Sequence, residues 1–316
     1  MQNGGIMKIK KVGILGAGAV GSYVIWGLYK KQDIQLGLIA QGERAERLKK
    51  GIYINDVKYN PEVWSECNDL DLLIVCLKYT ALEQALDTIE QVVNEHTIVM
   101  SLMNGVDSEE IIANRIGQEH ILYSLIKVAS HKEKNGFYFD PETTIGIVLG
   151  GKLEYVDVVN ELFENTPIHY RVSDCILEEI WSKFRLNVCN NLPQAILGCG
   201  VGCYQDSIHM QAIQKGLRDE LETIAKMKGI DLSKVDSSSN HGSMVSKSAR
   251  YSTLQDLDAK RHTEIDMFSF ALMRMGKELG VPTPYNEYTY HMIKALEEKN
   301  DGLFDYSKTK EKTSAK

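Results

Sequence analysis

Residues 11–21 read KVGILGAGAVG, which joins a short apolar run to a glycine-rich turn. The run Lys11–Leu15 predicts a β-strand, and the apolar spacing of residues 20–31 predicts an α-helix directly after the turn. Between them, Gly16-Ala17-Gly18-Ala19-Val20-Gly21 fits the spacing Gly-x-Gly-x-x-Gly of dinucleotide-binding turns. The first glycine permits the tight turn, the second lets a pyrophosphate approach the backbone, and the third lets the helix pack on the strand. The alternative interpretation is a glycine-rich turn without a ligand.

Strands and helices continue to alternate through the first half of the chain. Apolar runs predict strands at 34–40, 70–77, 97–102, 120–130, 136–139 and 143–149, and helical spacing predicts a helix at 79–93. Residues 70–77 are almost entirely apolar, which is typical of a strand buried on both faces. This alternation predicts an α/β fold with a parallel, doubly wound sheet of the Rossmann type.

The second half of the chain has a different pattern, in which long helical stretches dominate. Helices are predicted at 175–198, 208–228, 263–280 and 284–299, the last with Thr283 as N-cap before Pro284. We therefore expect a dinucleotide-binding domain at 1–174 and an all-helical substrate and catalytic domain at 175–316. The polar stretch 236–248 predicts a mobile loop, and the charged tail from about 307 predicts disorder.

Composition and charge argue against nucleic acid and membranes as partners of this chain. The 316 residues include 36 Lys and Arg and 43 Asp and Glu, and the net charge of −7 disfavours a general affinity for nucleic acid. No apolar run reaches the length of a membrane span, and residues 1–11 lack the apolar stretch of a signal peptide. The six cysteines are dispersed, so we expect free thiols, no metal site and a cytoplasmic location.

The end of the second predicted strand bears on the choice of dinucleotide. A carboxylate there would hold the ribose hydroxyls of NAD, but Gln41 occupies the position and Arg44 follows three residues later. Arginine suits a 2′-phosphate, so the sequence favours NADP, while Glu43 keeps NAD open. The alternative interpretation of Arg44 is a solvated residue at the start of a helix.

Polar residues also recur on the first helix of the second domain. Lys183, Asn187 and Asn191 are four residues apart in a helix that is otherwise largely apolar, so they share one face. Buried polar groups need partners, so this face suggests a lined cleft, although an ordinary exposed stripe is the alternative. Glu264 lies at the expected start of a later helix, where acidic residues are common. Its functional interpretation is a carboxylate that faces Lys183 across the cleft between the domains.

These segments together resemble the ketopantoate reductase (2-dehydropantoate 2-reductase) family over residues 12–299. The resemblance rests on five segments in order: Gly16–Gly21, Cys76-Leu77-Lys78, Leu102-Met103-Asn104-Gly105-Val106, Trp181–Asn187, and Leu254–Asp256 with His262–Asp266. Three positions depart from the family pattern, namely Gln41 after the second strand, Ala81 after Lys78, and Val201 in the second domain.

The resemblance implies a role for each matching residue. Lys183 would act as general acid on the substrate carbonyl oxygen, and Glu264 would stand near the reaction centre. The substrate would be bound by Asn104, Asn187, Asn191 and Ser252. The dinucleotide would be bound by Gly16, Ala17, Gly18, Ala19, Val20, Gly21, Arg44, Lys78 and Asn104. Lysine suits its role because hydride transfer to a ketone builds negative charge on oxygen, which a proton-donating cation stabilises.

The main hypothesis is thus an NADPH-dependent reduction of a small 2-oxo acid, ketopantoate to pantoate, in pantothenate biosynthesis. An NAD-dependent D-2-hydroxyacid dehydrogenase of the mandelate type is the alternative from the same fold. A dinucleotide-binding sensor without turnover is the alternative from another class. Retention of Lys183, Asn187 and Glu264 argues against the sensor, since sensing needs no proton donor. The sequence leaves the oligomeric state open, a homodimer included.

Overall fold

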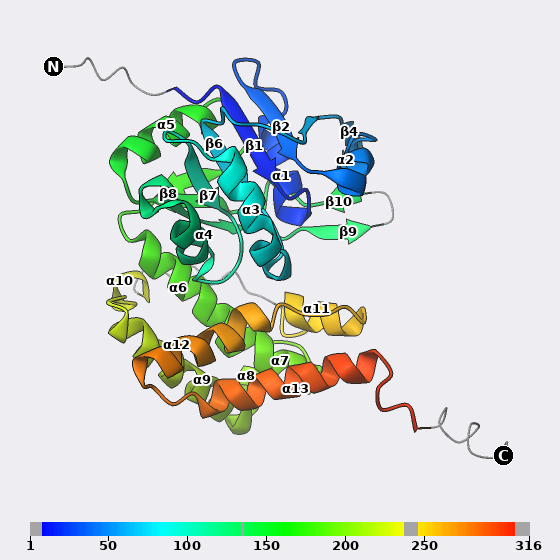
Figure 1. Cartoon of the computed structure of the whole chain (residues 1–316). Coiled ribbons are helices and arrows are strands. Elements are labelled where there is room, and N and C mark those ends of the chain that lie inside the picture. Colours follow the sequence, from blue (N-terminus) through cyan, green and yellow to red (C-terminus); the bar gives the residue numbers. More distant parts are fainter. Residues whose placement is uncertain (1–7, 134–135, 237–245, 307–316) are drawn as a thin grey trace, which may run out of the picture. The chain divides into compact units, whose positions relative to one another are not determined.

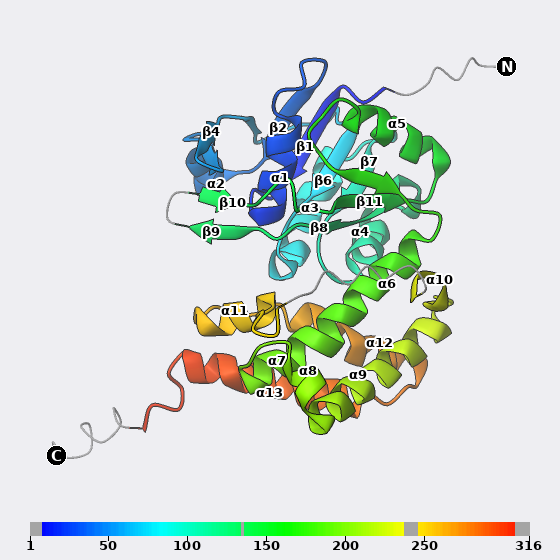
Figure 2. The same ribbon diagram turned by 180° about the vertical axis from the view of Figure 1, so that it is seen from behind.

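The computed structural model describes residues 8–133, 136–236 and 246–306 (Figures 1 and 2). The chain divides into two compact units, Met1–Ile180 and Trp181–Lys316. The division lies inside helix α6 (Ile176–Leu186), six residues after the sequence-based boundary. The predicted disordered tail and most of the predicted mobile loop lie outside the described residues.

A mixed sheet forms the centre of the first unit. Among the described residues its eight strands follow the order β12-β11-β8-β7-β6-β1-β2-β5. Their bounds are β1 Lys11–Leu15, β2 Gln35–Ile39, β5 Glu62–Trp64, β6 Leu72–Val75, β7 Ile98–Ser101, β8 Ile121–Lys127, β11 Gly146–Gly150 and β12 Tyr170–Val172. All pairs from β5 to β8 are parallel, which confirms the predicted arrangement. The prediction was incomplete at one edge, because β11 runs antiparallel to β8.

Helices pack on both faces of this sheet, which makes it doubly wound (Figures 1 and 2). Their bounds are α1 Ala19–Leu28, α2 Gly42–Leu48, α3 Leu82–Val92, α4 Ser108–Ile116 and α5 Leu153–Phe163, with short helical turns η1 Tyr79–Ala81 and η2 Gln118–His120. Alternate residues of β6 enter different cores: Ile74 packs with α1 and α5, and Leu73 packs with α3 and α4. This alternation confirms that the strand is buried on both faces.

A second, smaller sheet went largely unpredicted. It contains β4 (Val57–Tyr59), β3 (Ile52–Ile54), β10 (Gly136–Tyr138) and β9 (His131–Glu133), in that order. Asn55 and Asp56 join β3 to β4 with φ values of 46° and 63°. Such positive values at two central residues are those of the tight turn that favours Asn and Asp in hairpins.

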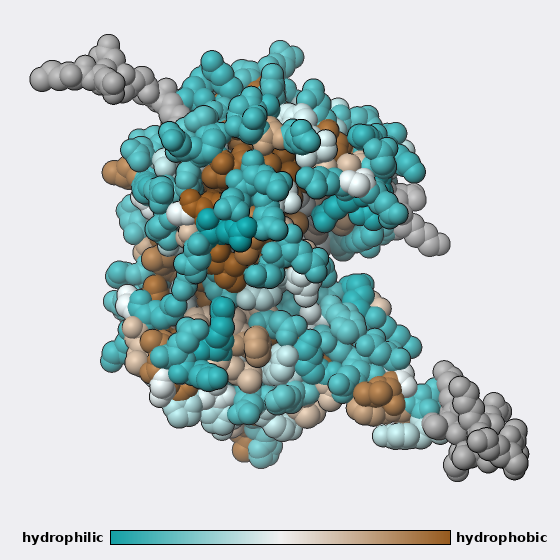
Figure 3. Space-filling view, in the orientation of Figure 1, coloured by the Kyte–Doolittle hydropathy of each residue, from teal (hydrophilic) through white to brown (hydrophobic). Residues whose placement is uncertain are grey.

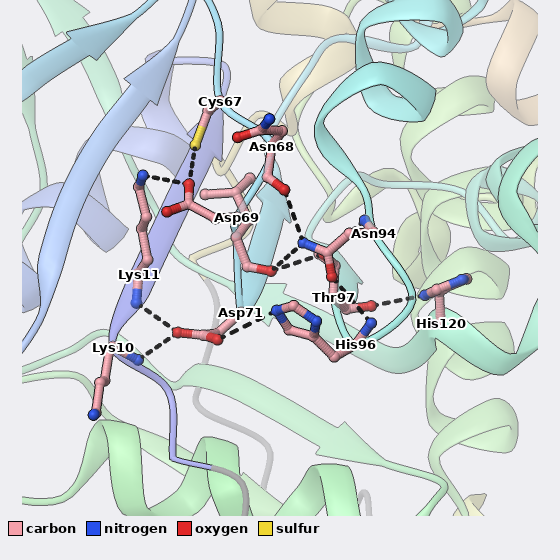
Figure 4. Close-up of polar contacts among 11 residues, drawn as sticks. Lys10, Lys11, Cys67, Asn68, Asp69, Asp71, Asn94, His96, Thr97 and His120 are labelled. Atoms are coloured by element: carbon pink, nitrogen blue, oxygen red, sulfur yellow. Dashed lines mark hydrogen bonds and ion pairs between the residues drawn. The ribbon is translucent and has the colours of Figure 1, made fainter.

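Side chains tie together the amino ends of the central strands, as Figure 4 shows. The Asp71 carboxylate accepts the backbone N–H groups of Lys10 and Lys11, both at 2.8 Å. The Thr97 hydroxyl donates to the carbonyl of Leu70 at 2.7 Å. These contacts supply hydrogen-bond partners to backbone groups at the start of β1 and just before β6.

The second unit is helical. Its α-helices are α7 Leu192–Leu197, α8 Cys203–Asp206, α9 Ile208–Met227, α10 Ser233–Asp236, α11 Ser252–Asp258, α12 Ala271–Leu279 and α13 Pro284–Asn300. The described residues of this unit also include two π-helical turns, η3 Asn187–Asn191 and η4 Asp266–Phe270. The predicted helix at 175–198 is therefore interrupted by η3. The helix predicted from 263 was placed too early, because the helical residues begin at Asp266.

A distant carboxylate caps the start of α13. Thr283 occupies the N-cap position, but its side chain makes no capping hydrogen bond. Instead, Glu220 of α9 accepts the N–H groups of Tyr285 at 2.7 Å and Asn286 at 3.0 Å. A negative charge at this end of a helix also interacts favourably with the helix dipole. The predicted start of α13 and the predicted N-cap position of Thr283 are confirmed, but the capping hydrogen bonds come from Glu220 and not from the Thr283 side chain.

Hydrophilic residues cover most of the face shown in Figure 3. Leu217 and Leu221 of α9 and Ile293 of α13 are buried at 0% exposure, so the amphipathic helices place their apolar faces inside the second unit. Across the described ranges, no helix combines the length and the hydropathy needed to cross a bilayer.

Candidate active site

The three glycines of the first turn occupy different environments. Gly16 has a φ of 109°, and a Cβ atom there would lie 2.5 Å from the carbonyl oxygen of Cys76. A Cβ at Gly21 would lie 2.0 Å from the carbonyl oxygen of Gly16. At Gly18, by contrast, a Cβ would meet no protein atom within 4 Å. Gly16 and Gly21 thus serve the turn and the packing of α1, while Gly18 faces open space where a ligand can approach.

The other predicted dinucleotide contacts follow neighbouring strands of the sheet. Arg44 comes after β2, Lys78 after β6 and Asn104 after β7, while the glycine turn comes after β1. Because β2, β1, β6 and β7 are adjacent and parallel, their carboxyl ends share one edge. The structure therefore gathers these residues at the edge where open α/β sheets bind ligands.

The exposures of these residues differ. Ala17, Ala19, Val20 and Asn104 are half-buried, whereas Arg44 and Lys78 are exposed. Gln41 donates from Nε2 to the carbonyl of Ser65 at 3.2 Å. Arg44 belongs to the short helix α2, so it also fits the alternative interpretation, a solvated residue near the start of a helix that binds no ligand.

The polar stripe of the second unit coincides with the π-helical turn. Lys183 is half-buried in α6, and Asn187 and Asn191 are the first and last residues of η3. Asn191 is 4% exposed, and its Nδ2 donates to Asn187 Oδ1 at 3.1 Å. Asn191 Oδ1 is buried, and no group in the described residues donates to it. A buried acceptor without a donor is unfavourable unless a ligand or water supplies one, and π-helical turns are frequent at functional sites.

Glu264 and Ser252 occupy separate segments of the same unit. Glu264 is half-buried two residues before η4, and Ser252 is the exposed first residue of α11. The ring centroids of Phe184 and Phe268 lie 6.2 Å apart, which joins α6 to η4. Lys183 and Glu264 thus belong to one unit, so the predicted pairing across a cleft between two domains was wrong in its placement.

Gln194 is a residue that the sequence interpretation missed. It is completely buried in α7, where Nε2 donates to the carbonyl of Ala249 at 2.8 Å and Oε1 accepts the N–H of Tyr251 at 2.9 Å. It therefore holds the segment that leads into Ser252. The signal was present, because Gln194 extends the polar stripe by three residues beyond Asn191.

Neither cysteine next to these sites is a candidate nucleophile. Burial raises the pKa of Cys189, inside η3, to about 12. Burial also raises the pKa of Cys76, beside Gly16, far above its ordinary value. A thiol reacts as its thiolate, so both side chains pack as small apolar groups. Within residues 8–133, 136–236 and 246–306, no three His, Cys, Asp or Glu side chains are grouped to hold a metal ion.

Both halves of the chain match one known protein family. Residues 12–148 match the family described as "Ketopantoate reductase PanE/ApbA", and residues 175–297 match its C-terminal part, "Ketopantoate reductase PanE/ApbA C terminal". This chain belongs to the ketopantoate reductase family. The predicted family is confirmed, and the family is one of oxidoreductases. Each of the two matches falls within one of the two predicted domains.

Relatives of the ketopantoate reductase family align over most of the chain. A 2-dehydropantoate 2-reductase of Pyrococcus horikoshii is 28% identical over 312 residues, covering 92% of this chain and 99% of that protein. D-mandelate dehydrogenase in a ternary complex with NADH and anilino(oxo)acetate has a TM-score of 0.78 at 23% identity. A dimeric ketopantoate reductase from Staphylococcus aureus has a TM-score of 0.73 at 16% identity. In each of these two comparisons the aligned region covers 92% of this chain and 99% of the solved chain, so both proteins share its fold.

Proposed function

We propose that this chain reduces a small 2-oxo acid with NADPH, and that its substrate is 2-dehydropantoate (ketopantoate), the precursor of pantoate in pantothenate biosynthesis. The observation that carries the proposal is the open space at Gly18, at the carboxyl edge of the parallel strands in a chain of the ketopantoate reductase family. That space is where the pyrophosphate of a nicotinamide dinucleotide would approach the backbone.

The residues at this edge suit the dinucleotide. The turn Gly16–Gly21 and the first N–H groups of α1 would face the pyrophosphate, because a helix N-terminus favours negative charge. Arg44 would meet the 2′-phosphate of NADP, and Lys78 would supply a second cation. Asn104 would lie by the nicotinamide and the substrate. A bound NADPH would supply a hydride to the carbonyl carbon of the substrate.

The residues of the second unit would provide the rest of the chemistry. As a C–H bond forms at the carbonyl carbon, the π electrons of the C=O bond move to oxygen. Lys183 would stabilise this charge and donate a proton to the oxygen, which yields the alcohol and leaves a neutral amine that regains its proton from solvent. Asn187 and Asn191 would bind the substrate. The buried Oδ1 of Asn191 would accept a hydrogen bond from a substrate hydroxyl.

A steady-state assay tests the substrate and the cofactor together. Ketopantoate and phenylglyoxylate are each supplied with NADPH and with NADH, and kcat/KM is measured for the four pairs. We expect the highest value for ketopantoate with NADPH. The double variant Arg44→Ala and Lys78→Ala should lose the preference for NADPH without losing turnover. Selective turnover of phenylglyoxylate with NADH would instead support a D-2-hydroxyacid dehydrogenase, the alternative that the fold of D-mandelate dehydrogenase favours.

We also propose that the enzyme is a homodimer that works in the cytoplasm on its small-molecule substrate. Support for the dimer comes from the dimeric relative of Staphylococcus aureus. Sedimentation velocity at micromolar concentration should give the mass of two chains of 35.6 kDa. A single species at the mass of one chain would contradict the dimer and leave the proposed reaction intact.

A further inference from the structure

One face of α13 contacts the segment that bears Glu264. Tyr290, Lys294, Glu297 and Asp301 follow one another at intervals of four, three and four residues, so they share a helix face. Tyr290 Oη donates to Asp266 at 3.1 Å, and Lys294 Nζ donates to the same carboxylate at 3.0 Å. At the other end, Asp301 lies 3.0 Å from His262 Nε2. Residues 262–266 are therefore held by α13 and by Asp301, the residue directly after it.

Glu297 is the most buried member of this face, with 3% exposure. Its Oε1 accepts two hydrogen bonds from Thr263, one from the backbone N–H at 2.7 Å and one from the hydroxyl at 2.6 Å. Its Oε2 lies 3.3 Å from Lys294 Nζ and 3.5 Å from His262 Nδ1. A buried carboxylate is unfavourable unless it is paired and hydrogen-bonded, and these partners fulfil both conditions.

The hydrogen bonds of Thr263 hold the backbone on both sides of Glu264, directly at Thr263 and through the Thr263 hydroxyl at Ile265. Thr263 precedes Glu264 and is 4% exposed. Ile265 follows it at 0% exposure, and its N–H lies 3.3 Å from the Thr263 hydroxyl that Glu297 accepts. Helical residues begin only at Asp266, so no helix spans Glu264. The buried carboxylate of Glu297 thus supplies hydrogen bonds that hold this turn, where no helix supplies them.

We infer that Glu297 is a positioning residue, which sets the place of the Glu264 carboxylate for catalysis through Thr263. This inference rests on the proposed function of Glu264. Lys294 completes the arrangement: burial lowers its pKa, but the carboxylates of Asp266 and Glu297 outweigh burial and leave the pKa above its ordinary value. The ammonium group therefore stays charged and balances the two acids.

The test compares Glu297→Ala with Glu298→Ala, its exposed neighbour on the same helix. Displacement of a catalytic group by about 1 Å can lower a rate by about a hundredfold, so we expect kcat of Glu297→Ala to fall roughly ten- to a hundredfold. The dissociation constant of NADPH should not change, because the glycine turn belongs to the first unit. Glu298→Ala should keep the wild-type kcat.

A double variant separates positioning from simple stabilisation. In a Glu264→Ala background, Glu297→Ala should lower kcat less than about twofold, since no carboxylate remains to be placed. If Glu297 only stabilises the fold, the kcat losses of the two single variants should multiply in the double variant. Alternatively, kcat of Glu297→Ala should stay at the wild-type value while its Tm falls. Either result overturns the inference. If Glu297→Ala does not fold, Thr263→Val takes its place, because it keeps the backbone N–H and removes only the hydroxyl. The same kcat and Tm outcomes then support or overturn the inference.

Failure of the proposed function would look different. A wild-type enzyme without turnover, or a Glu264→Ala variant with full turnover, would refute the proposed roles and leave the contact with Thr263 to be tested by amide hydrogen exchange. Exchange at Thr263 and Ile265 should then rise at least tenfold in Glu297→Ala and not in Glu298→Ala. Equal exchange in the two variants would overturn the inference.

Discussion

The substitution Gly18→Val separates binding of the dinucleotide from folding. Gly18 has a φ of −85°, which any residue adopts, and a Cβ atom there meets no protein atom within 4 Å. The variant should therefore fold. Its side chain would fill the space that the pyrophosphate needs, so affinity for NADPH should be lost. Gly18 is also the N-cap of α1, where valine is less favourable than glycine, so we expect about 1 kcal/mol of lost stability without ligand.

The size of the expected effect follows from mass action. NADPH at a hundred times its Kd stabilises the folded protein by about 2.7 kcal/mol. For a unit the size of Met1–Ile180, about 1 kcal/mol shifts Tm by roughly 2–4 °C, so NADPH should raise the wild-type Tm by about 5–10 °C. The rise should be absent in Gly18→Val. Thermal scans with and without NADPH, together with titration calorimetry, measure both quantities.

Gly21→Ala is the contrasting variant in the same turn. Its Cβ would lie 2.0 Å from the carbonyl oxygen of Gly16, and neither backbone can yield without moving α1. We expect a loss of about 1–3 kcal/mol in the free energy of unfolding even without ligand. If Gly18→Val binds NADPH with the wild-type Kd and shows the full rise in Tm, the glycine turn is not the dinucleotide site and the reasoning fails.

Three further predictions concern the proton donor, the cap of α13 and an ion pair. Lys183→Ala should lower kcat by roughly a hundred- to ten-thousandfold with an unchanged Kd for NADPH, and a variant with full turnover would show that the stripe is only a polar helix face. Glu220→Gln should lower the free energy of unfolding by about 1.5–3 kcal/mol in urea titrations, well beyond the effect of Glu287→Gln, which is exposed on α13. Burial raises the pKa of Glu179, but the hydrogen bonds from Arg171 and Ser173 and the positive charges of Arg171 and Lys127 together outweigh burial and leave that pKa below its ordinary value. The ionised Glu179 therefore stabilises the folded protein above about pH 4.3, and this stabilisation is lost as pH falls through the pKa of the folded state. The Tm difference between the wild type and Glu179→Gln should shrink at acidic pH. An equal Tm difference at pH 7 and at pH 3 would contradict this prediction.

The core of the fold could be predicted because its signals are local. The run Lys11–Leu15, the glycines and the helix after them are consecutive in the chain, and burial on both faces makes a strand such as β6 apolar. The small sheet lacks such signals, since β9 is exposed throughout and β3 alternates over only three residues. Tertiary contacts decide strands of that kind, so sequence periodicity does not reveal them.

The site could be predicted in part for the same reason. The spacing of Lys183, Asn187 and Asn191 singled out these residues, but not that Asn187–Asn191 forms a π-helical turn with a hydrogen bond between its two ends. A π-helical turn adds a residue to one turn of a helix and is rare, so the apolar spacing of a helix does not reveal it. The role of Gln194 was likewise hidden, because its partners lie more than fifty residues away.

Distance along the chain also explains why the two halves of the proposed machinery should respond differently to mutation. The glycine turn is built from consecutive residues, so its backbone should be disturbed mainly by changes within it or at Cys76 and Leu77 beside it. The segment around Glu264 has no helix of its own and depends on Glu297, which lies 34 residues after its partner Thr263. Substitutions on the inner face of α13 should therefore reduce turnover although they lie outside the proposed substrate contacts. Affinity for the dinucleotide is the control, because it depends on a different unit of the protein.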